Sequence, residues 1–291
     1  MVIGMNMPSV RFHQPEPRLR PYLTAYYYVE FPPGEPVEDL LMPEWSGVRF
    51  ALRGEWCASV GGPDAAPQRM PVSLFGHTSR TGLIRCETPG LGLGVGMLPL
   101  GWTEIVRLPP ADYVDRIVDP AEAFGEEAAR LFDELSAAEG DAARNALLDH
   151  FFLSRVEGRP PPSETILKAH AVLNDPAVGT TEEFAAALGV SVRQASRLSE
   201  KLFGFPPKLL LRRQRFLRTL GVIRDNLNQP WAEQLDPWYY DQSHFVRDFH
   251  DFMGMSPSAY FTSKGVILAA AGQARARALG QSLQGLEAPR A

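Results

Sequence analysis

The stretch DQSHFVRDFHDF, which begins at Asp241, sets aromatic rings and hydrogen-bonding side chains at helical spacing. An α-helix turns about 100° per residue, so Phe245, Phe249 and the phenylalanine after them fall on one apolar stripe. Ser243 and Arg247 then point nearly opposite that stripe. We therefore predict a helix that is buried along one side and presents hydrogen-bond donors along the other.

The same pattern occurs 50 residues earlier, in SVRQASRLSEKLFGFPP from Ser191. An alanine and two leucines form its buried stripe, and Arg193 and Arg197 point away from it. Ser191 is a residue type that caps helix N-termini, and a glycine follows each of the two helices, as glycines often do at helix ends. The repeat predicts two copies of one structural unit.

The segment TTEEFAAALGVSVRQASRL predicts that the earlier helix is the second helix of a helix-turn-helix. Ala185 is small enough to let two helices cross closely, and Gly189 comes four residues later, where a turn is needed. In DNA-binding proteins this second helix enters the major groove.

Between the two copies, PPKLLLRRQRFLRTLGVIRDN predicts one long helix that begins at a proline. Its apolar residues, Phe216 and Leu220 among them, share one side, and Arg212, Arg215 and Arg218 share the other. About 19 residues at about 1.5 Å each give a helix of about 28 Å. This length is close to the roughly 34 Å between successive major grooves of B-DNA, so the helix could set two recognition helices in neighbouring grooves.

Charge is unevenly distributed over the 291 residues, whose formal net charge is −5. Residues 1–162 hold 14 Lys and Arg against 22 Asp and Glu, whereas residues 163–264 hold 12 against 11. Residues 163–264 are basic only in comparison with the preceding region, and typical DNA-binding domains carry more positive charge.

The cysteines Cys57 and Cys86 lack the spacing of a disulfide framework or a metal site. We find no signal peptide and no membrane-spanning run, so we expect a cytoplasmic protein.

We predict a multi-domain chain. Residues 1–158 form an α+β sensor or dimerisation domain: an antiparallel, β-rich sandwich or barrel up to about residue 110, then helices from about 119 to 156. After the Pro-rich linker EGRPPPSE, residues 159–264 form an all-α domain with two helix-turn-helix units joined by the long helix. Residues 265–291 are rich in Ala, Gly and Gln, and we expect a weakly structured tail.

The chain resembles the AraC-type (AraC/XylS) transcription regulators over about residues 163–262. The similarity is carried by YYDQSHFVRDFHDFMGMSPSAYF, LGVSVRQASRL and FGFPPKLLLRRQRFLR. LRPYLTAYYYVEF and GVGMLPLGWTEIVRLPPADYVDRIVD are more weakly similar to the sensor domain of one branch of these regulators. The resemblance implies double-stranded DNA and RNA polymerase as partners, with a small-molecule effector or a second copy of the chain bound at the sensor domain.

The resemblance also implies which residues read bases. They are Arg193, Ser196 and Arg197 in the first unit, and Ser243, His244 and Arg247 in the second. These positions agree with the outward faces predicted from spacing, and the arginine fork fits the two acceptors of guanine, which is worth about 1–3 kcal/mol of discrimination. Lys201 and Lys208 are expected to bind phosphates, as is Gln242 at the helix N-terminus.

Two departures from the family pattern leave alternatives open. Ser199 replaces a large apolar residue, so the first unit has a thinner core. In PWAEQLDPWYY a proline inside a helix would cost about 3 kcal/mol, so the helix that leads the second unit must be short, and Trp238 stands where a turn glycine is usual. The second unit would then bind DNA weakly or contact only its backbone. His244 could pack between helices instead of reading a base, and Asp248 could brace Arg247 or a neighbouring helix instead of meeting DNA.

In the sensor domain, Trp45, Trp56 and Trp102 are candidates for lining an effector pocket, with a place in the core as the alternative. GLGLGVGMLP from Gly90 lacks the third glycine of a dinucleotide loop, since Met97 occupies its place, and is expected to be a strand packed against bulky neighbours. We find no catalytic triad, phosphate loop or zinc signature, so we expect no enzyme, cofactor or metal site. No membrane partner is expected.

We therefore expect a sequence-specific, effector-responsive DNA-binding transcription regulator. The alternative is a regulator-derived ligand- or protein-binding module with degenerate DNA recognition, which the near-neutral charge favours.

Arg197→Ala should relax the base preference at one position of the bound DNA and cost about 1–3 kcal/mol, because a bidentate contact to guanine is lost. The measurement is binding of the variant to a set of single-base changes in a selected DNA. An equal loss on every sequence would instead identify a phosphate contact.

Overall fold

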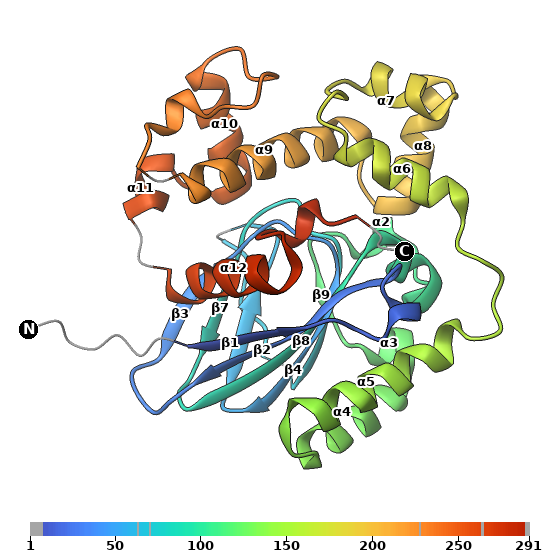
Figure 1. Ribbon diagram of the computed structural model, residues 1–291, viewed down its shortest axis with the longest axis vertical. Coiled ribbons are helices and arrows are strands. Elements are labelled where there is room, and N and C mark those ends of the chain that lie inside the picture. The colour runs from blue at the N-terminus through green and yellow to red at the C-terminus, as the bar shows by residue number, and fades with distance from the viewer. Residues whose placement is uncertain (1–7, 63, 70, 227, 263–264, 289–291) are drawn as a thin grey trace, which may run out of the picture.

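The computed structural model describes residues 8–288 apart from 63, 70, 227 and 263–264. The described chain consists of a β-rich N-terminal part and a layer of helices above it (Figure 1). None of the described helices combines the length and the apolar character needed to cross a membrane.

Two antiparallel sheets form the centre of the N-terminal part, as the spacing of its short strands predicts. The six-stranded sheet has the order β1 (Ser9–His13), β2 (Leu23–Phe31), β8 (Gly90–Met97), β4 (Gly47–Arg53), β6 (Val72–Phe75), β9 (Ile117–Val118). The three-stranded sheet has the order β3 (Val37–Leu41), β7 (Gly82–Cys86), β5 (Trp56–Ser59).

The glycines of β8 make room for aromatic rings, as the sequence predicts. A Cβ on Gly94 would lie 2.0 Å from Cζ of Tyr27, and one on Gly92 would lie 3.2 Å from the indole of Trp56. No side chain fits at Gly94 unless the ring moves. The glycine spacing therefore serves packing inside the sheet, and the two rings that it accommodates face the cavity described below.

Helices follow the strands as predicted for residues 119–156. The elements of this stretch and its approach are α1 (Pro99–Gly101), the π-type turn η2 (Trp102–Val106), α2 (Pro110–Tyr113), α3 (Ala121–Phe124), α4 (Glu127–Ala137) and α5 (Gly140–Val156). A further short turn, η1 (Pro17–Leu19), lies between β1 and β2. The sheet is tied to α5 by two buried tyrosines: the hydroxyl of Tyr26 donates to Asp149 at 2.8 Å and that of Tyr28 to Asn145 at 2.8 Å.

The helical part contains the first predicted helix-turn-helix, the predicted long helix and the recognition helix predicted for the second unit. Its elements are α6 (Glu164–Asn174), α7 (Thr181–Leu188), α8 (Val192–Phe203), α9 (Pro207–Asp225), η3 (Trp231–Glu233), α10 (Gln242–Met253), α11 (Pro257–Thr262), α12 (Val266–Leu279) and η4 (Gln284–Leu286). Helix α9 has 19 residues, the length predicted for the connecting helix. The domain boundary placed between residues 158 and 159 stays a prediction.

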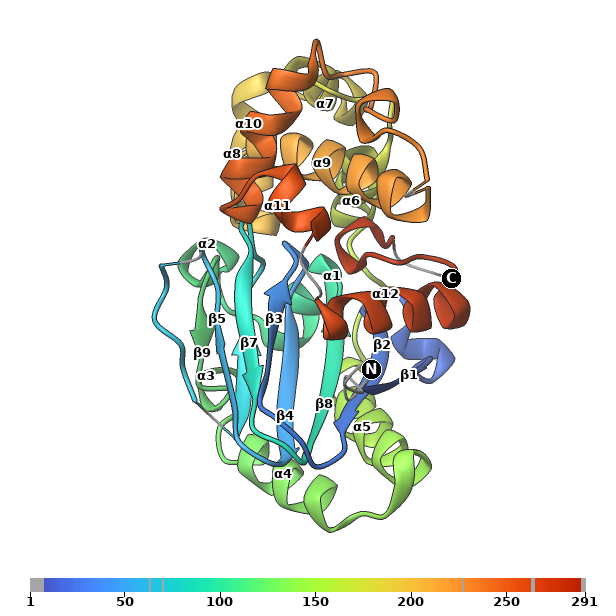
Figure 2. The same cartoon turned by 90° about the vertical axis from the view of Figure 1, so that its left-hand side faces the viewer.

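The expectation of a weakly structured tail is corrected by α12, a 14-residue helix that packs against β1 and β3 beside the sheet (Figures 1 and 2). Composition does not reveal the tertiary contacts that hold this helix. A Cβ on Gly272 would lie 2.4 Å from a guanidinium nitrogen of Arg224 in α9, so a larger residue would require that guanidinium to move. The buried guanidinium of Arg275 donates to Glu287 at 2.7 Å and 3.0 Å.

Trp45, in the loop between β3 and β4, joins the two parts of the chain. Its ring lies 5.2 Å from that of His170 in α6 and 5.9 Å from that of Phe203 in α8. The guanidinium of Arg213, from α9, stacks 3.9 Å above it and donates to the carbonyl oxygen of Thr78 at 2.8 Å. One hydrophobic core therefore runs from the sheet into the first helix-turn-helix unit.

Acidification should weaken this contact. Burial, and next the positive charge of Arg213, lower the pKa of His170 from 6.5 to about 3. A folded-state pKa below the unfolded value gives stability that is present above about pH 6.5 and is lost as the pH falls towards 3. At pH 5 the unfolded chain binds a proton at His170 and the folded chain does not, so the free energy of unfolding should be about 2 kcal/mol lower.

The check is urea unfolding at pH 7 and pH 5 of the wild-type chain and His170→Phe, which should lose this part of the pH dependence. His150→Phe, at an exposed position of α5, is the matched control and should behave as wild type. An equal acid loss in wild type and His170→Phe would contradict the assignment.

Candidate DNA-binding surface and ligand cavity

The first helix-turn-helix unit consists of α7 and α8. Thr180 and Ser191 cap the two helices, each in a reciprocal pair with the residue three positions later. Gly189 has φ 76°, the left-handed conformation that the turn requires, and Ala185 is buried at the crossing. The alanine and glycine signals in the sequence are confirmed.

The outward face of α8 carries the predicted cations. Arg193, Arg197 and Lys201 are exposed, as is Lys208 at the start of α9. Ser196 is half-buried, and its hydroxyl donates to the carbonyl oxygen of Val192 at 3.0 Å, so it is committed to its own helix in this structure.

Ser199 does not leave an unsatisfied group in the core. It is completely buried, and its hydroxyl donates to the carbonyl oxygen of Phe205 at 2.7 Å. The bond ties α8 to the start of the next segment, where Gly204 ends the helix with φ 77°. The smaller side chain thus replaces apolar contact with a hydrogen bond across the turn.

Helix α10 is built in the same way. The carboxylate of Asp241 accepts from the backbone N–H of His244 at 2.7 Å, and Gly254 ends the helix with φ 69°. The predicted phenylalanine stripe is buried against Phe216 of α9, whose ring lies 5.1 Å from that of Phe252. On the other side of the helix, the predicted residues Gln242, Ser243 and Arg247 are exposed.

A buried carboxylate fixes α10 on α9. Asp248 is 1% exposed and accepts from Arg212 at 3.0 Å and from Arg215 at 2.8 Å. It also accepts from the hydroxyl of Tyr239 at 3.1 Å. Of the two roles left open for Asp248, bracing a neighbouring helix is the one that the contacts support.

His244 is half-buried and contacts the same network. Its Nε2 lies 3.2 Å from a guanidinium nitrogen of Arg215. Partial burial, followed by Arg215, lowers its pKa. The neutral ring can then accept a hydrogen bond from Arg215, which directs Nε2 inwards. This contact favours the packing role over base reading for that nitrogen.

The arginine face predicted for α9 is not a free basic surface. Arg212 and Arg215 are bound to Asp248, and Arg218 pairs with Asp236 at 3.0 Å. Spacing places these side chains opposite the apolar stripe, but it carries no information about acids that reach them from α10 and the preceding loop. Exposed cations of the helical part include those on α8, at the start of α9 and on α10.

The second unit lacks a leading α-helix within its described residues, because the segment before α10 forms only the single turn η3. Trp238 instead contacts the loop that leads into α7 of the first unit. Its Nε1 donates to the carbonyl oxygen of Pro176 at 3.0 Å, and a Cβ on Gly179 would lie 2.3 Å from the indole. The two units are therefore joined directly as well as through α9.

Helices α8 and α10 stand at opposite ends of α9 (Figure 1) and on the same side of it (Figure 2). Two exposed apolar side chains at the starts of these helices were not predicted from the sequence. Tyr240, just before α10, is 96% exposed and stacks on His244, and Val192 at the start of α8 is 43% exposed. Their position in the sequence could have identified them. An apolar residue that lies at a helix N-terminus and outside the buried stripe cannot pack into the core.

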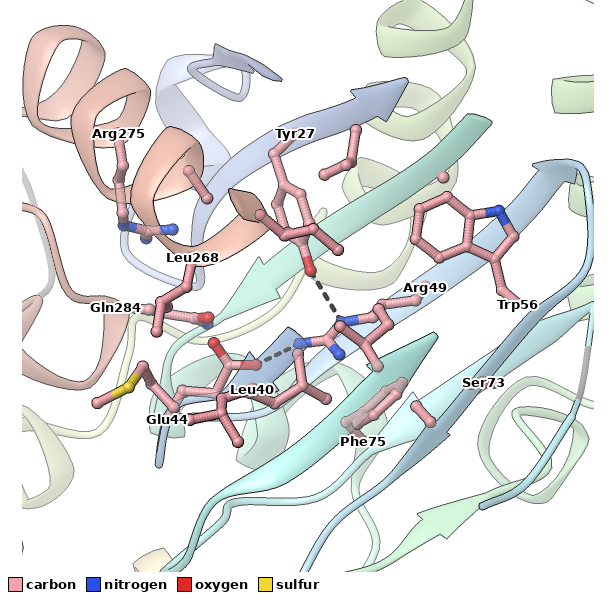
Figure 3. A pocket seen from close by; sticks show the side chains of 18 of the residues that line it. Tyr27, Leu40, Glu44, Arg49, Trp56, Ser73, Phe75, Leu268, Arg275 and Gln284 are labelled. Atoms are coloured by element: carbon pink, nitrogen blue, oxygen red, sulfur yellow. Dashed lines mark hydrogen bonds and ion pairs between the residues drawn. The ribbon is translucent and has the colours of Figure 1, made fainter. Parts of the chain in front are cut away.

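A cavity of about 160 Å³ lies between the sheet and α12 (Figure 3). Trp56 lines it, and its contact with an effector stays a prediction. Trp45 and Trp102 do not line it, which corrects their candidacy: both are buried in the main core, where the Nε1 of Trp102 donates to the carbonyl oxygen of Leu108 at 2.8 Å. Tryptophan content alone does not separate a cavity wall from a core.

Residues 184–263 match the family model of a helix-turn-helix domain of the AraC type. A search of curated proteins by sequence gives no match. Among solved structures, wild-type ToxT from Vibrio cholerae strain SCE256 with bound unsaturated fatty acid is 11% identical over 90% of this chain and 99% of that chain, with a TM-score of 0.43. The AraC-like transcriptional activator CuxR is 14% identical over 72% of this chain and 86% of that chain, with a TM-score of 0.30.

Asp248→Ala should destabilise the fold by about 3–5 kcal/mol, because it leaves two guanidinium groups at a buried site without their carboxylate. Asp251→Ala is the matched control: it removes an exposed partner of Arg212 on the same helix and should cost at most about 1 kcal/mol. Urea unfolding measures both. A loss in Asp248→Ala no larger than the control would show that the buried network does not hold α10.

Proposed function

Since residues 184–263 form an AraC-type helix-turn-helix domain, we propose that the protein is a transcription regulator that reads DNA through α8 and α10 and responds to a small molecule in the cavity. The observation that carries the proposal is the pair of similarly capped helices, fixed on one connecting helix, whose outward faces are exposed.

The exposed residues suit major-groove recognition. Arg193, Arg197 and Arg247 can each offer a bidentate fork to guanine. Lys201 and Lys208 lie beside them, where phosphates would pass. The length of α9, about 28 Å, approaches the roughly 34 Å repeat of the groove, so neighbouring grooves are within reach.

The two apolar side chains at the starts of α8 and α10 extend this set. Val192 can contact a thymine methyl group, and Tyr240 can contact the DNA backbone through its hydroxyl. His244 contributes to this surface with the ring face that stacks on Tyr240, because its Nε2 lies against Arg215.

The cavity is positioned to influence the DNA-binding part because its wall is tied to both parts of the chain. Leu268 of α12 lines it. The backbone N–H of Leu268 donates to Asp39 of β3 at 2.7 Å, and its carbonyl oxygen accepts from Arg224 of α9 at 3.1 Å. A ligand that binds more tightly to one position of α12 than to another would shift α9 with it.

The rival function is a binding module with degenerate DNA recognition. The pairing of Arg212, Arg215 and Arg218 inside the protein favours it, because it reduces the charge available to phosphates. So does the single-turn lead into α10. A second copy of the chain and RNA polymerase stay predictions from the family resemblance.

Salt dependence separates the two functions. The full chain should select specific fragments from random DNA, and the logarithm of its affinity for them should fall linearly with the logarithm of salt concentration. Lys208→Ala should reduce the slope by about 1 and leave the selected sequence unchanged, because a phosphate contact is lost. Fluorescence anisotropy over a salt series is the measurement.

Arg130→Ala, at an exposed position of α4 in the N-terminal part, is the control and should alter neither slope nor sequence. Failure to enrich any sequence, with weak binding to all DNA, would favour the rival.

A further inference from the structure

The C-terminal ends of both recognition helices lie against the N-terminal part of the chain (Figure 2). The carbonyl oxygen of Phe252, in the last turn of α10, accepts from the backbone N–H of Thr81 at 2.7 Å. Carbonyl groups in the last turn of a helix have no partner within the helix, so this bond satisfies one of them. Thr81 belongs to residues 76–81, the loop between β6 and β7.

The end of α8 meets a second segment of the N-terminal part. Helix α2 packs against α8 (Figure 1). A Cβ on Gly204, which ends α8, would lie 2.9 Å from the carbonyl oxygen of Pro110 and 2.2 Å from the side chain of Val114. The end of α8 is therefore in close contact with residues 110–114.

The two segments are joined to each other by Asp115. Its carboxylate accepts from the backbone N–H and from the hydroxyl of Ser79, both at 2.6 Å. Its own backbone N–H donates to the carbonyl oxygen of His77 at 2.9 Å. We call residues 76–81 and 110–115 together the support, since each segment of it contacts one recognition helix.

Two backbone features show that the support is held in one arrangement. Asp115 has φ 54°, a left-handed conformation that residues other than glycine keep only where the surrounding contacts hold them. The hydrogen bonds of Asp115 are such contacts. A Cβ on Gly76 would lie 1.8 Å from the carbonyl oxygen of Tyr113, and only glycine fits there because the obstacle is main chain.

The second unit depends on the support more than the first. In the first unit the leading helix α7 packs against α8, whereas only the single turn η3 precedes α10. The support holds α10 at Thr81 and also holds the connecting helix, because Arg213 of α9 donates to the carbonyl oxygen of Thr78 at 2.8 Å. It thus supplies a constraint on α10 that the short leading turn does not.

We propose that the N-terminal part positions the recognition helices: the support sets the separation and angle of α8 and α10, and Asp115 is its positioning residue. The proposal rests on the proposed function for the DNA, and it gives the N-terminal part a share in reading the spacing of two half-sites. Its geometric part is tested without DNA.

The test without DNA measures the distance between α8 and α10 by double electron–electron resonance. Spin labels are placed at Glu200→Cys and His250→Cys, two exposed positions, in a Cys57→Ser background that keeps only the buried Cys86. The chain with Asp115 should give one narrow distance distribution. Asp115→Ala should widen it about twofold or more, because released helices populate several arrangements. An unchanged distribution in folded Asp115→Ala would overturn the proposal.

Asp112→Ala is the matched control, because it removes an exposed acid from α2 in the same segment, and it should keep the original distribution. Ser79→Ala removes one hydrogen bond and leaves the charge and backbone of Asp115 unchanged, so it should widen the distribution less than Asp115→Ala. If thermal unfolding shows that Asp115→Ala does not fold, Ser79→Ala decides the question, and an unchanged distribution there would refute the positioning role.

With DNA, the readout is the spacing of the half-sites. Affinity is measured by anisotropy for the selected DNA and for the same DNA with one base pair inserted between the half-sites, which moves them apart by about 3.4 Å and turns them by about 35°. The wild-type chain should lose affinity about tenfold or more on insertion, and Asp115→Ala about threefold or less, because only rigidly held helices demand one spacing. A general loss of stability would lower both affinities equally and leave their ratio unchanged.

The two measurements distinguish failure of this proposal from failure of the proposed function. An equal spacing penalty in wild type and Asp115→Ala would overturn the positioning role and leave the proposed function standing. A widened distribution in Asp115→Ala, together with no specific DNA binding by the wild-type chain, would refute the proposed function and support the positioning of the two helices.

Discussion

The polar side chains of α9 hold the other elements in place. Arg212 and Arg215 bind Asp248 of α10, and Arg224 binds the carbonyl oxygen of Leu268 in α12. Gln214 donates to Asn174 of α6 and to the carbonyl oxygen of Gly285, and Arg213 enters the N-terminal part to reach Thr78. The exposed face of α10 follows from this helix, because Asp248 on the opposite side of α10 is bound by Arg212 and Arg215.

Burying so much charge on one helix is unfavourable unless each group finds its partner in the right geometry. Such contacts contribute less to net stability than apolar packing would, but an alternative arrangement that breaks one of them is strongly destabilised. Arg213 is the extreme case: burial lowers its pKa to about 9, and its only hydrogen bond among the described residues goes to one carbonyl. The connecting helix is thus held in one register against the N-terminal part.

The helix-turn-helix units could be predicted because their signals are local. Thr180, Ser191 and Gly189 specify caps and a turn within a few residues, and the phenylalanine spacing of α10 specifies its buried side. The β-rich N-terminal part followed from strand spacing in the same way.

What could not be predicted depends on partners far away in the sequence. Periodicity places Arg212 and Arg215 on a polar face but does not reveal Asp248, more than 30 residues later. Neither does composition reveal that α12 packs on β1, or which tryptophan faces the cavity. These contacts arise from tertiary structure. A buried ion pair or a glycine at a close approach determines where a segment packs, and the composition of the segment does not.

The central claim is that α8 and α10 enter one face of a duplex together. Hydroxyl-radical footprinting of the full chain on its selected DNA tests this most directly. Two protected stretches about 10 base pairs apart on the same face are expected, one for each recognition helix. A single protected stretch, or two on opposite faces, would contradict it.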